Sequence, residues 1–157
     1  MAGFTSFEPL LRKVMATYKP HKILEFGPGR STEIMLEYLD VHVISIEHDW
    51  RYYEEKRSQI KNATIHYAPQ LPLYLAIAST FAPYDFVFVD GFCDWRVACL
   101  KSAVAMLTHD GLVMLHDSER SKYDEGRSYY DTVEESDGTA LLKPKDIRES
   151  CLVTKPN

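Results

Sequence analysis

The stretch Ile23-Leu24-Glu25-Phe26-Gly27-Pro28-Gly29-Arg30-Ser31-Thr32 decides the expected fold, together with a second apolar run, Val41-His42-Val43-Ile44-Ser45-Ile46, that ends on Glu47. In order, these residues predict a strand, a tight glycine loop, a helix and a second strand that closes on a carboxylate. Gly27 and Gly29 allow a sharp turn and a close approach of backbone to a ligand. Glu47 can accept hydrogen bonds from a ribose diol. The stretch therefore predicts a nucleoside site in an open α/β sheet.

The details of the loop favour one kind of nucleoside over another. A glycine turn and an acidic strand end also occur in α/β proteins that bind no nucleoside, but loop, helix, strand and acid together favour the site. The dinucleotide fingerprint needs a third glycine where this chain has Ser31, so NAD is disfavoured. Glu25 lies two residues before the first glycine and points to a cationic ligand, because a carboxylate there can order the groups that hold an ammonium.

Size and composition predict a single domain over residues 1–157. Hydrophobic residues make up 45% of the chain and charged residues 26%, which are globular values, and no apolar run approaches the roughly 20 residues that span a bilayer. The amino terminus lacks the pattern of a secretory signal, so we expect a cytoplasmic protein without a membrane partner. A net charge of −5 argues against nucleic acid. The spacing of Cys93, Cys99 and Cys151 matches neither a zinc site nor a disulfide framework, which predicts reduced thiols.

Helices and strands are expected to alternate through most of the chain. The domain divides into an N-terminal helix at 1–19, a nucleoside-binding core at 20–117, and a C-terminal helix and strand pair at 118–157. Apolar spacing, caps and turn residues predict helices at 5–18, 31–39, 49–60, 73–77, 96–107 and 128–135, and strands at 22–26, 42–47, 64–67, 84–91, 112–115, 139–142 and 151–154. Two closing strands without a helix between them suggest an antiparallel edge on a parallel sheet.

The pattern Glu25-x-Gly27-x-Gly29, with Glu47 after the second strand and Asp90 after the fourth, resembles the class I S-adenosylmethionine-dependent methyltransferases, in particular small O-methyltransferases. The resemblance covers about residues 20 to 120. It implies an α/β fold with a doubly wound, mostly parallel, seven-stranded Rossmann-like sheet whose last strand is antiparallel, in three layers α/β/α. By resemblance, Glu25, Phe26, Gly27 and Gly29 line the methionine part of the cofactor S-adenosylmethionine, Glu47 holds the ribose, and His48 neighbours the adenine. The chain departs from the family after the third strand, where members often have an acid and this chain reads Ala68-Pro69-Gln70, so Gln70 is the candidate acceptor for the adenine. Ser31 and Thr32 at the helix start and Asp90 complete the expected cofactor residues.

Asp90, His116 and Asp117 come at the ends of the fourth and fifth strands, where open α/β sheets bind ligands. Three interpretations stay open. The resemblance to some O-methyltransferases implies a divalent metal, Mg or Mn, held by these three residues, although histidine is unusual for magnesium. Without a metal, His116 or Asp90 is a general base. In the third interpretation the three residues only cap turns and satisfy hydrogen bonds.

These residues predict a methyltransferase that moves a methyl group to an oxygen, less readily a nitrogen, of a small-molecule acceptor. The alternatives are another nucleoside-using enzyme on the same fold, or a non-catalytic module that binds the nucleoside and regulates a partner. Trp95 and Arg96 are interpreted as packing residues at a helix start, with contact to a substrate as the alternative. We expect the acceptor to be bound by the opening helix, the tail, the 117–127 loop or a second subunit. Phe4, Phe7 and Leu11 either form the surface of a homodimer or pack on the sheet.

Overall fold

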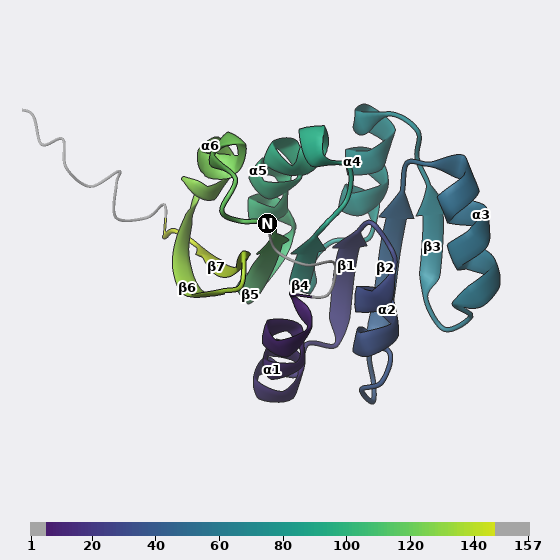
Figure 1. Cartoon of the computed structure of the whole chain (residues 1–157), viewed down its shortest axis with the longest axis horizontal. Coiled ribbons are helices and arrows are strands. Elements are labelled where there is room, and N and C mark those ends of the chain that lie inside the picture. Colours follow the sequence, from purple (N-terminus) through teal and green to yellow (C-terminus); the bar gives the residue numbers. More distant parts are fainter. Residues whose placement is uncertain (1–5, 147–157) are drawn as a thin grey trace, which may run out of the picture.

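A computed structural model of the chain describes residues 6–146 and shows a seven-stranded sheet flanked by helices (Figure 1). The strand order is β3-β2-β1-β4-β5-β7-β6. The first five strands pair in parallel, and β7 lies antiparallel between β5 and β6. The doubly wound sheet with a reversed last strand is as predicted. The strands are β1 (Lys22–Phe26), β2 (His42–Glu47), β3 (Thr64–Tyr67), β4 (Tyr84–Val89), β5 (Leu107–His116), β6 (Tyr130–Ser136) and β7 (Thr139–Pro144).

The helices cover both faces of the sheet and give the three expected layers. One hydrophobic core lies between the sheet and α1 and α2, and a second lies between the sheet and α4 and α5, with α6 against α5 (Figure 1). α3 packs beside β3 and buries no residue completely. The helices are α1 (Glu8–Tyr18), α2 (Arg30–Met35), α3 (Trp50–Gln59), α4 (Leu71–Thr80), α5 (Arg96–Met106) and α6 (Asp124–Arg127), with short 3-10 turns η1 (Cys93–Trp95) and η2 (Ser121–Tyr123).

The opening helix uses its apolar side to cover the sheet. Phe7 and Leu11 are buried in the core formed with α2, so they are not available as the surface of a homodimer in this chain. Phe4, the third residue of that expected surface, lies outside the described residues. Tyr18 has the helical spacing of the buried stripe but is 51% exposed. The buried stripe therefore ends at Met15, one turn before the helix does.

The predicted helix at 128–135 is wrong, because this segment is strand β6. Its side chains are mostly exposed, so an edge strand here shows no apolar alternation that would reveal it. The stronger signal is the Asp137-Gly138 pair, both at positive φ, which closes a tight hairpin with β7. The expected strand at 139–142 is confirmed as β7, and the one at 151–154 lies outside the described residues.

Further boundaries differ from the prediction. α2 ends at Met35 rather than at position 39, and α4 spans ten residues where a brief helix was expected. β5 begins at Leu107 rather than at 112, because its first residues pair with Tyr84 before a register shift in the β4–β5 ladder. β4 ends at Val89 rather than at 91, and β5 ends at His116 rather than at 115, so the carboxyl ends of these two strands move by two residues and one residue.

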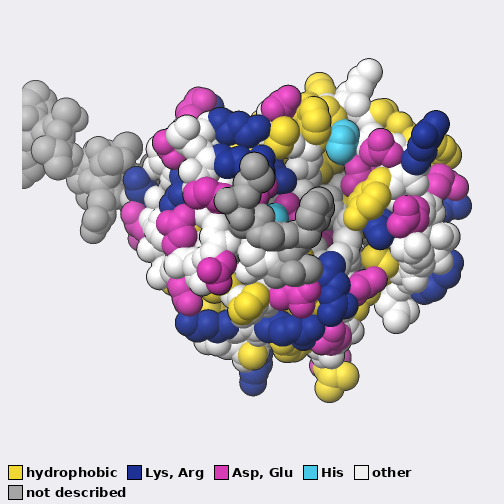
Figure 2. Space-filling model, in the orientation of Figure 1, with side chains coloured by type: hydrophobic (Ala, Val, Ile, Leu, Met, Phe, Trp, Pro, Cys, Tyr) yellow, Lys and Arg dark blue, Asp and Glu magenta, His cyan; other side chains and the backbone are white. Residues whose placement is uncertain are grey.

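No helix among residues 6–146 combines the length and the apolar character needed to cross a bilayer. Lysine and arginine side chains alternate with acidic ones over the face of the molecule seen in Figure 2. The charge on this face is therefore mixed in sign.

Candidate active site

A cleft of about 940 Å³ opens at the carboxyl ends of the parallel strands. Its volume is at the upper end of the range for small-molecule sites. One half is built by the loops after β1 and β2, which we call the β1/β2 half, and the other by the loops after β4 and β5, the β4/β5 half. The residues that line the cleft include Phe7, Gly27, Gly29, Glu47, His48, Asp90, Arg96 and His116.

The floor of the cleft is formed where two glycines meet. Gly27 has a φ of +93°, and a Cβ added to it would lie 2.9 Å from the Cα of Gly91. The amide of Gly27 donates to the carbonyl of Ile46, and that of Asp90 donates to the carbonyl of Phe26, so the two loops are held by their own backbones. Glycine is therefore required at position 27 both by its backbone angle and by the close approach of the β4 loop.

Glu47 is held at the tip of β2 with one oxygen engaged. Its Oε1 accepts hydrogen bonds of 2.7 Å from the amides of His48 and Asp49, and the residue is 4% exposed. Within residues 6–146 its Oε2 has no hydrogen-bond partner. An immobilised carboxylate with one free oxygen at the cleft is suited to accept hydrogen bonds from a ligand diol.

Aromatic side chains connect the ends of β2 and β4. The ring of His48 lies 4.9 Å from that of Phe92 and 5.4 Å from that of Trp95, measured between centroids. His48 and Phe92 line the cleft, and Phe92 is 38% exposed. A flat apolar wall of this kind is suited to a purine ring. The sequence singled out His48 and missed Phe92.

Glu25 lies below the glycine loop and not in the cleft. It is fully buried and accepts hydrogen bonds from the hydroxyls of Ser31, Thr32 and Ser45. Burial without a cationic partner raises the pKa of its carboxyl from 4.5 to about 7, although the three hydroxyls oppose that rise. Glu25 therefore shapes the loop from beneath, through the first turn of α2.

The structure separates the predicted cofactor residues into two sets. Gly27, Gly29, Ser31, Glu47, His48 and Asp90 line the cleft. The others do not: Phe26 is buried and stacks on Tyr74, Thr32 accepts a hydrogen bond from the amide of Gly29 and donates to Glu25, and Gln70 is exposed before α4. Gly29, and not Ser31 or Thr32, is the N-cap of α2. Local sequence could not show that the side chains of Ser31 and Thr32 turn inward to Glu25.

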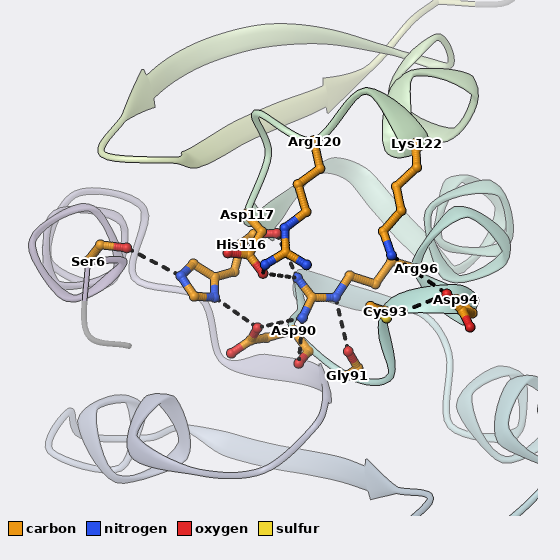
Figure 3. Close-up of polar contacts among 10 residues, drawn as sticks. All are labelled: Ser6, Asp90, Gly91, Cys93, Asp94, Arg96, His116, Asp117, Arg120 and Lys122. Carbon is orange, nitrogen blue, oxygen red and sulfur yellow. Dashed lines mark hydrogen bonds and ion pairs between the residues drawn. The ribbon is translucent and has the colours of Figure 1, made fainter. Parts of the chain in front are cut away.

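In the β4/β5 half, Asp90 and His116 form a pair (Figure 3). Nδ1 of His116 lies 2.9 Å from Oδ1 of Asp90, and Nε2 lies 3.3 Å from the hydroxyl of Ser6. Oδ1 of Asp90 also accepts a hydrogen bond of 3.1 Å from Arg96, so the carboxylate is an acceptor and Nδ1 is the donor. This leaves the lone pair of the imidazole on Nε2. The ring of Phe7 packs edge-on against His116 at 5.3 Å.

The interpretation of Arg96 as a helix-start packing residue is wrong, because its guanidinium is the centre of the β4/β5 half. It is 7% exposed and contacts the ends of both strands (Figure 3). It donates to the carbonyls of Asp90, Gly91 and His116 and to the carboxylates of Asp90 and Asp117. Asp117 has a φ of +55° and also pairs with Arg120 at 3.1 Å. The sequence did contain a signal for this role of Arg96. It lies six residues after the acid that follows one strand, and a second acid follows the next strand.

The predicted metal site does not fit this geometry. Among residues 6–146, no three His, Cys, Asp or Glu side chains are arranged to hold a metal ion. Asp90 and Asp117 direct oxygens to Arg96, and His116 directs its nitrogens to Asp90 and Ser6. The side-chain donors of the three predicted ligands therefore do not converge on one point.

Solved structures of methyltransferases have the same architecture. An O-methyltransferase from Bacillus cereus in complex with SAH superposes with a TM-score of 0.74 at 15% identity, over 87% of this chain and 79% of that one. The chain has the class I methyltransferase fold. A methyltransferase-like protein from Silicibacter pomeroyi gives a TM-score of 0.69 at 19% identity, over 96% of this chain and 92% of that one.

The methyltransferase fold alone does not fix the acceptor atom. An N-methyltransferase from Bradyrhizobium japonicum also superposes, with a TM-score of 0.66 at 16% identity, over 88% of this chain and 94% of that one. No family model and no curated protein matches the sequence. At these identities the likeness establishes the fold, and the function is argued from the site.

Proposed function

We propose that this protein is an S-adenosylmethionine-dependent methyltransferase that transfers a methyl group to an oxygen, less readily a nitrogen, of a small-molecule acceptor. One observation carries the proposal. A single cleft joins the glycine floor and the half-free carboxylate of Glu47 to the oriented Asp90–His116 pair. The first half fits a nucleoside cofactor and the second fits proton removal.

The residues of the β1/β2 half fit the cofactor. Gly27 lines the cleft with backbone alone, Glu47 presents Oε2 for the ribose hydroxyls, and His48 with Phe92 offers a wall for the adenine. When bound, S-adenosylmethionine would supply an electrophilic sulfonium methyl group and a neutral thioether, S-adenosylhomocysteine, as the leaving group.

His116 supplies the base for the acceptor. Asp90 fixes its Nδ1–H, so Nε2 takes the proton that the acceptor hydroxyl or amine loses as its oxygen or nitrogen forms the new bond to carbon. Ser6 and Phe7 lie against His116, which supports a role for the segment before α1 in contacting the acceptor. The remaining contribution of the protein is orientation of the two substrates.

Calorimetry with S-adenosylmethionine and S-adenosylhomocysteine tests the cofactor half. We expect Glu47→Ala to weaken S-adenosylhomocysteine binding by about 10-fold or more, because hydrogen bonds to a charged group contribute about 1.5–3 kcal/mol. Glu54→Ala is the matched control, since Glu54 is an exposed acid on α3 outside the cleft. The proposal fails if the wild-type protein binds neither nucleoside, or if Glu47→Ala binds as the wild type does.

A second experiment separates the enzyme from a binding module. We expect His116→Ala to keep its affinity for S-adenosylhomocysteine while methyl transfer to a panel of phenols, alcohols and amines falls by about 100-fold, the usual contribution of a general base. Product analysis in the same reactions identifies methylthioadenosine or homoserine lactone, which would reveal a different enzyme on this fold. Cofactor binding without any of these products would leave the module.

A further inference from the structure

The guanidinium of Arg96 has no N–H group left for a ligand. A guanidinium carries five N–H donors in a fixed plane. Nε donates to the carbonyl of Gly91 at 3.0 Å, Nη1 to the carbonyl of His116 at 2.8 Å and to Oδ2 of Asp117 at 3.3 Å, and Nη2 to the carbonyl and Oδ1 of Asp90 at 3.3 and 3.1 Å. Arg96 lines the cleft, but all of its donors are directed into the protein (Figure 3).

Arg96 therefore joins two strand ends that carry negative charge. Asp90 and Gly91 follow β4, while His116 ends β5 and Asp117 follows it. Two carboxylates with side chains only 24% and 13% exposed would repel each other across this edge without a cation between them. Arg120 pairs with Asp117 at 3.1 Å, whereas the rigid fork of donors on Arg96 contacts both carboxylates. A divalent cation bound between two acids would have the same electrostatic effect.

The hydrogen bond from Arg96 to Asp90 also connects Arg96 to the proposed base, His116. Oδ1 of Asp90 accepts hydrogen bonds from Nη2 of Arg96 and from Nδ1 of His116. The guanidinium fixes the position of this oxygen, and the oxygen fixes the tautomer of the imidazole. Arg96 is thus two hydrogen bonds away from Nε2, the atom that faces Ser6.

We propose that Arg96 is a built-in cation that takes the place of a divalent metal between Asp90 and Asp117, and that it positions His116 through Asp90. The inference rests on the proposed function for the reaction that His116 serves. Arg96 is a positioning residue, because all five of its N–H groups are engaged within the protein and it acts on the reaction through Asp90 and His116. The class of reaction that follows is methyl transfer assisted by a protein base without a bound metal.

Titration of the full chain with Mn²⁺ tests the first part. We expect no Mn²⁺ binding that depends on Asp90 or Asp117, measured by calorimetry and by water proton relaxation. Stoichiometric Mn²⁺ binding that is lost in Asp90→Asn or Asp117→Asn would overturn the inference. The measurement needs no nucleoside, so its outcome is independent of cofactor binding.

Nitrogen-15 spectroscopy of the histidine rings tests the second part. We expect the wild type to show His116 with its proton on Nδ1, assigned by comparison with His116→Gln. Arg96→Met removes the charge, and Arg96→Lys keeps the charge without the planar fork. In either variant we expect His116 to lose at least half of its Nδ1–H tautomer, while Arg12→Lys, at an exposed ion pair with Glu37, leaves the spectrum unchanged.

The two variants keep the test decisive. If Arg96→Met does not fold, Arg96→Lys provides the spectrum, and a His116 signal identical to that of the wild type would overturn the positioning role. Failure of the wild type to bind S-adenosylhomocysteine would instead remove the proposed function and leave these two measurements as they are.

Discussion

Each half of the cleft has acidic residues removed largely from solvent, and these acids are stabilised in different ways. In the β1/β2 half, Glu25 is fully buried, and its carboxylate accepts hydrogen bonds from the hydroxyls of Ser31, Thr32 and Ser45. In the β4/β5 half, the carboxylates of Asp90 and Asp117 share the guanidinium of Arg96. Hydroxyl groups satisfy the hydrogen-bonding capacity of a carboxylate but not its charge, which is why burial raises the pKa of Glu25 to about 7.

The difference separates a site that is left free for a ligand from one that the protein completes by itself. In the β1/β2 half the floor is bare backbone at Gly27 and one oxygen of Glu47 is unused. In the β4/β5 half every N–H donor of Arg96 is used. The lone pair of Nε2 of His116 remains, and this atom faces the hydroxyl of Ser6. The first half is organised to bind and the second to hold one base in place.

The largest expected effect comes from removing the cation of the β4/β5 half. Arg96→Met removes the guanidinium that pairs with half-buried Asp90 and leaves Asp117 with Arg120 alone, and we expect a loss of about 3–5 kcal/mol in the free energy of unfolding. Arg12→Met, which breaks an exposed ion pair, should cost less than about 1 kcal/mol. Urea denaturation at pH 7 measures both. Equal losses in the two variants would show that the two acids do not need Arg96.

Glu25 is expected to make the fold less stable as the pH rises. Its folded pKa of about 7 lies above the ordinary value of 4.5, so the folded protein keeps a proton that the unfolded chain has released between these values. The contribution is fully present below pH 4.5 and is lost as the pH passes through 7, a total of about 3 kcal/mol.

Urea denaturation of the wild type and Glu25→Gln between pH 4.5 and 8 measures this slope. The glutamine variant carries no titrating group at this position and should lose about 3 kcal/mol less over the range. If the free energy of unfolding changed with pH in the same way in both proteins, the charge of Glu25 would be compensated in the folded state, as the charges of Asp90 and Asp117 are by Arg96.

The glycines of the loop differ in what they require. Gly27→Ala puts a Cβ on a backbone with a φ of +93° and within 2.9 Å of Gly91, and we expect a loss of about 2 kcal/mol in unfolding free energy together with weaker nucleoside binding. Gly29→Ala meets only the hydroxyl of Tyr52 at 3.1 Å, a flexible end, and should cost less than about 1 kcal/mol. Thermal denaturation compares them, and a larger loss at Gly29 would contradict the assignment of the floor.

The smallest effect concerns two buried tyrosines, Tyr84 at the start of β4 and Tyr74 on α4. The hydroxyl of Tyr84 donates to the carbonyl of Ala78 at 2.6 Å, so Tyr84→Phe should cost about 1 kcal/mol. The hydroxyl of Tyr74, which lies under Gly91, is buried without a partner among the described residues. Tyr74→Phe should therefore be neutral or stabilising by up to about 1 kcal/mol, and a loss as large as that of Tyr84→Phe in urea denaturation would show a partner for this hydroxyl.

The sequence predicted the strands and loops whose signals are local. The run from Ile23 to Phe26 and the run from Tyr84 to Val89 are continuous in apolar residues, which identifies buried parallel strands. Their order along the chain and the right-handed crossovers then bring Gly27, Glu47, Asp90 and His116 to one edge. Segment 130–136 escaped prediction because an edge strand owes its structure to the partner strand and not to its own pattern.

What the sequence by itself determined is which groups meet at the carboxyl edge of the sheet, because strand order and direction fix that neighbourhood. Only the tertiary structure decided how they are paired. The local sequence around a carboxylate after a strand is the same whether the carboxylate binds a metal, a ribose or an arginine. Its partner depends on side chains that the fold brings in from other elements. Arg96 reaches across from the start of α5, and Ser31, Thr32 and Ser45 close over Glu25 from α2 and β2. The cost of burying a carboxylate without a hydrogen-bond donor or a counter-charge selects those partners, and it acts only once the chain is folded.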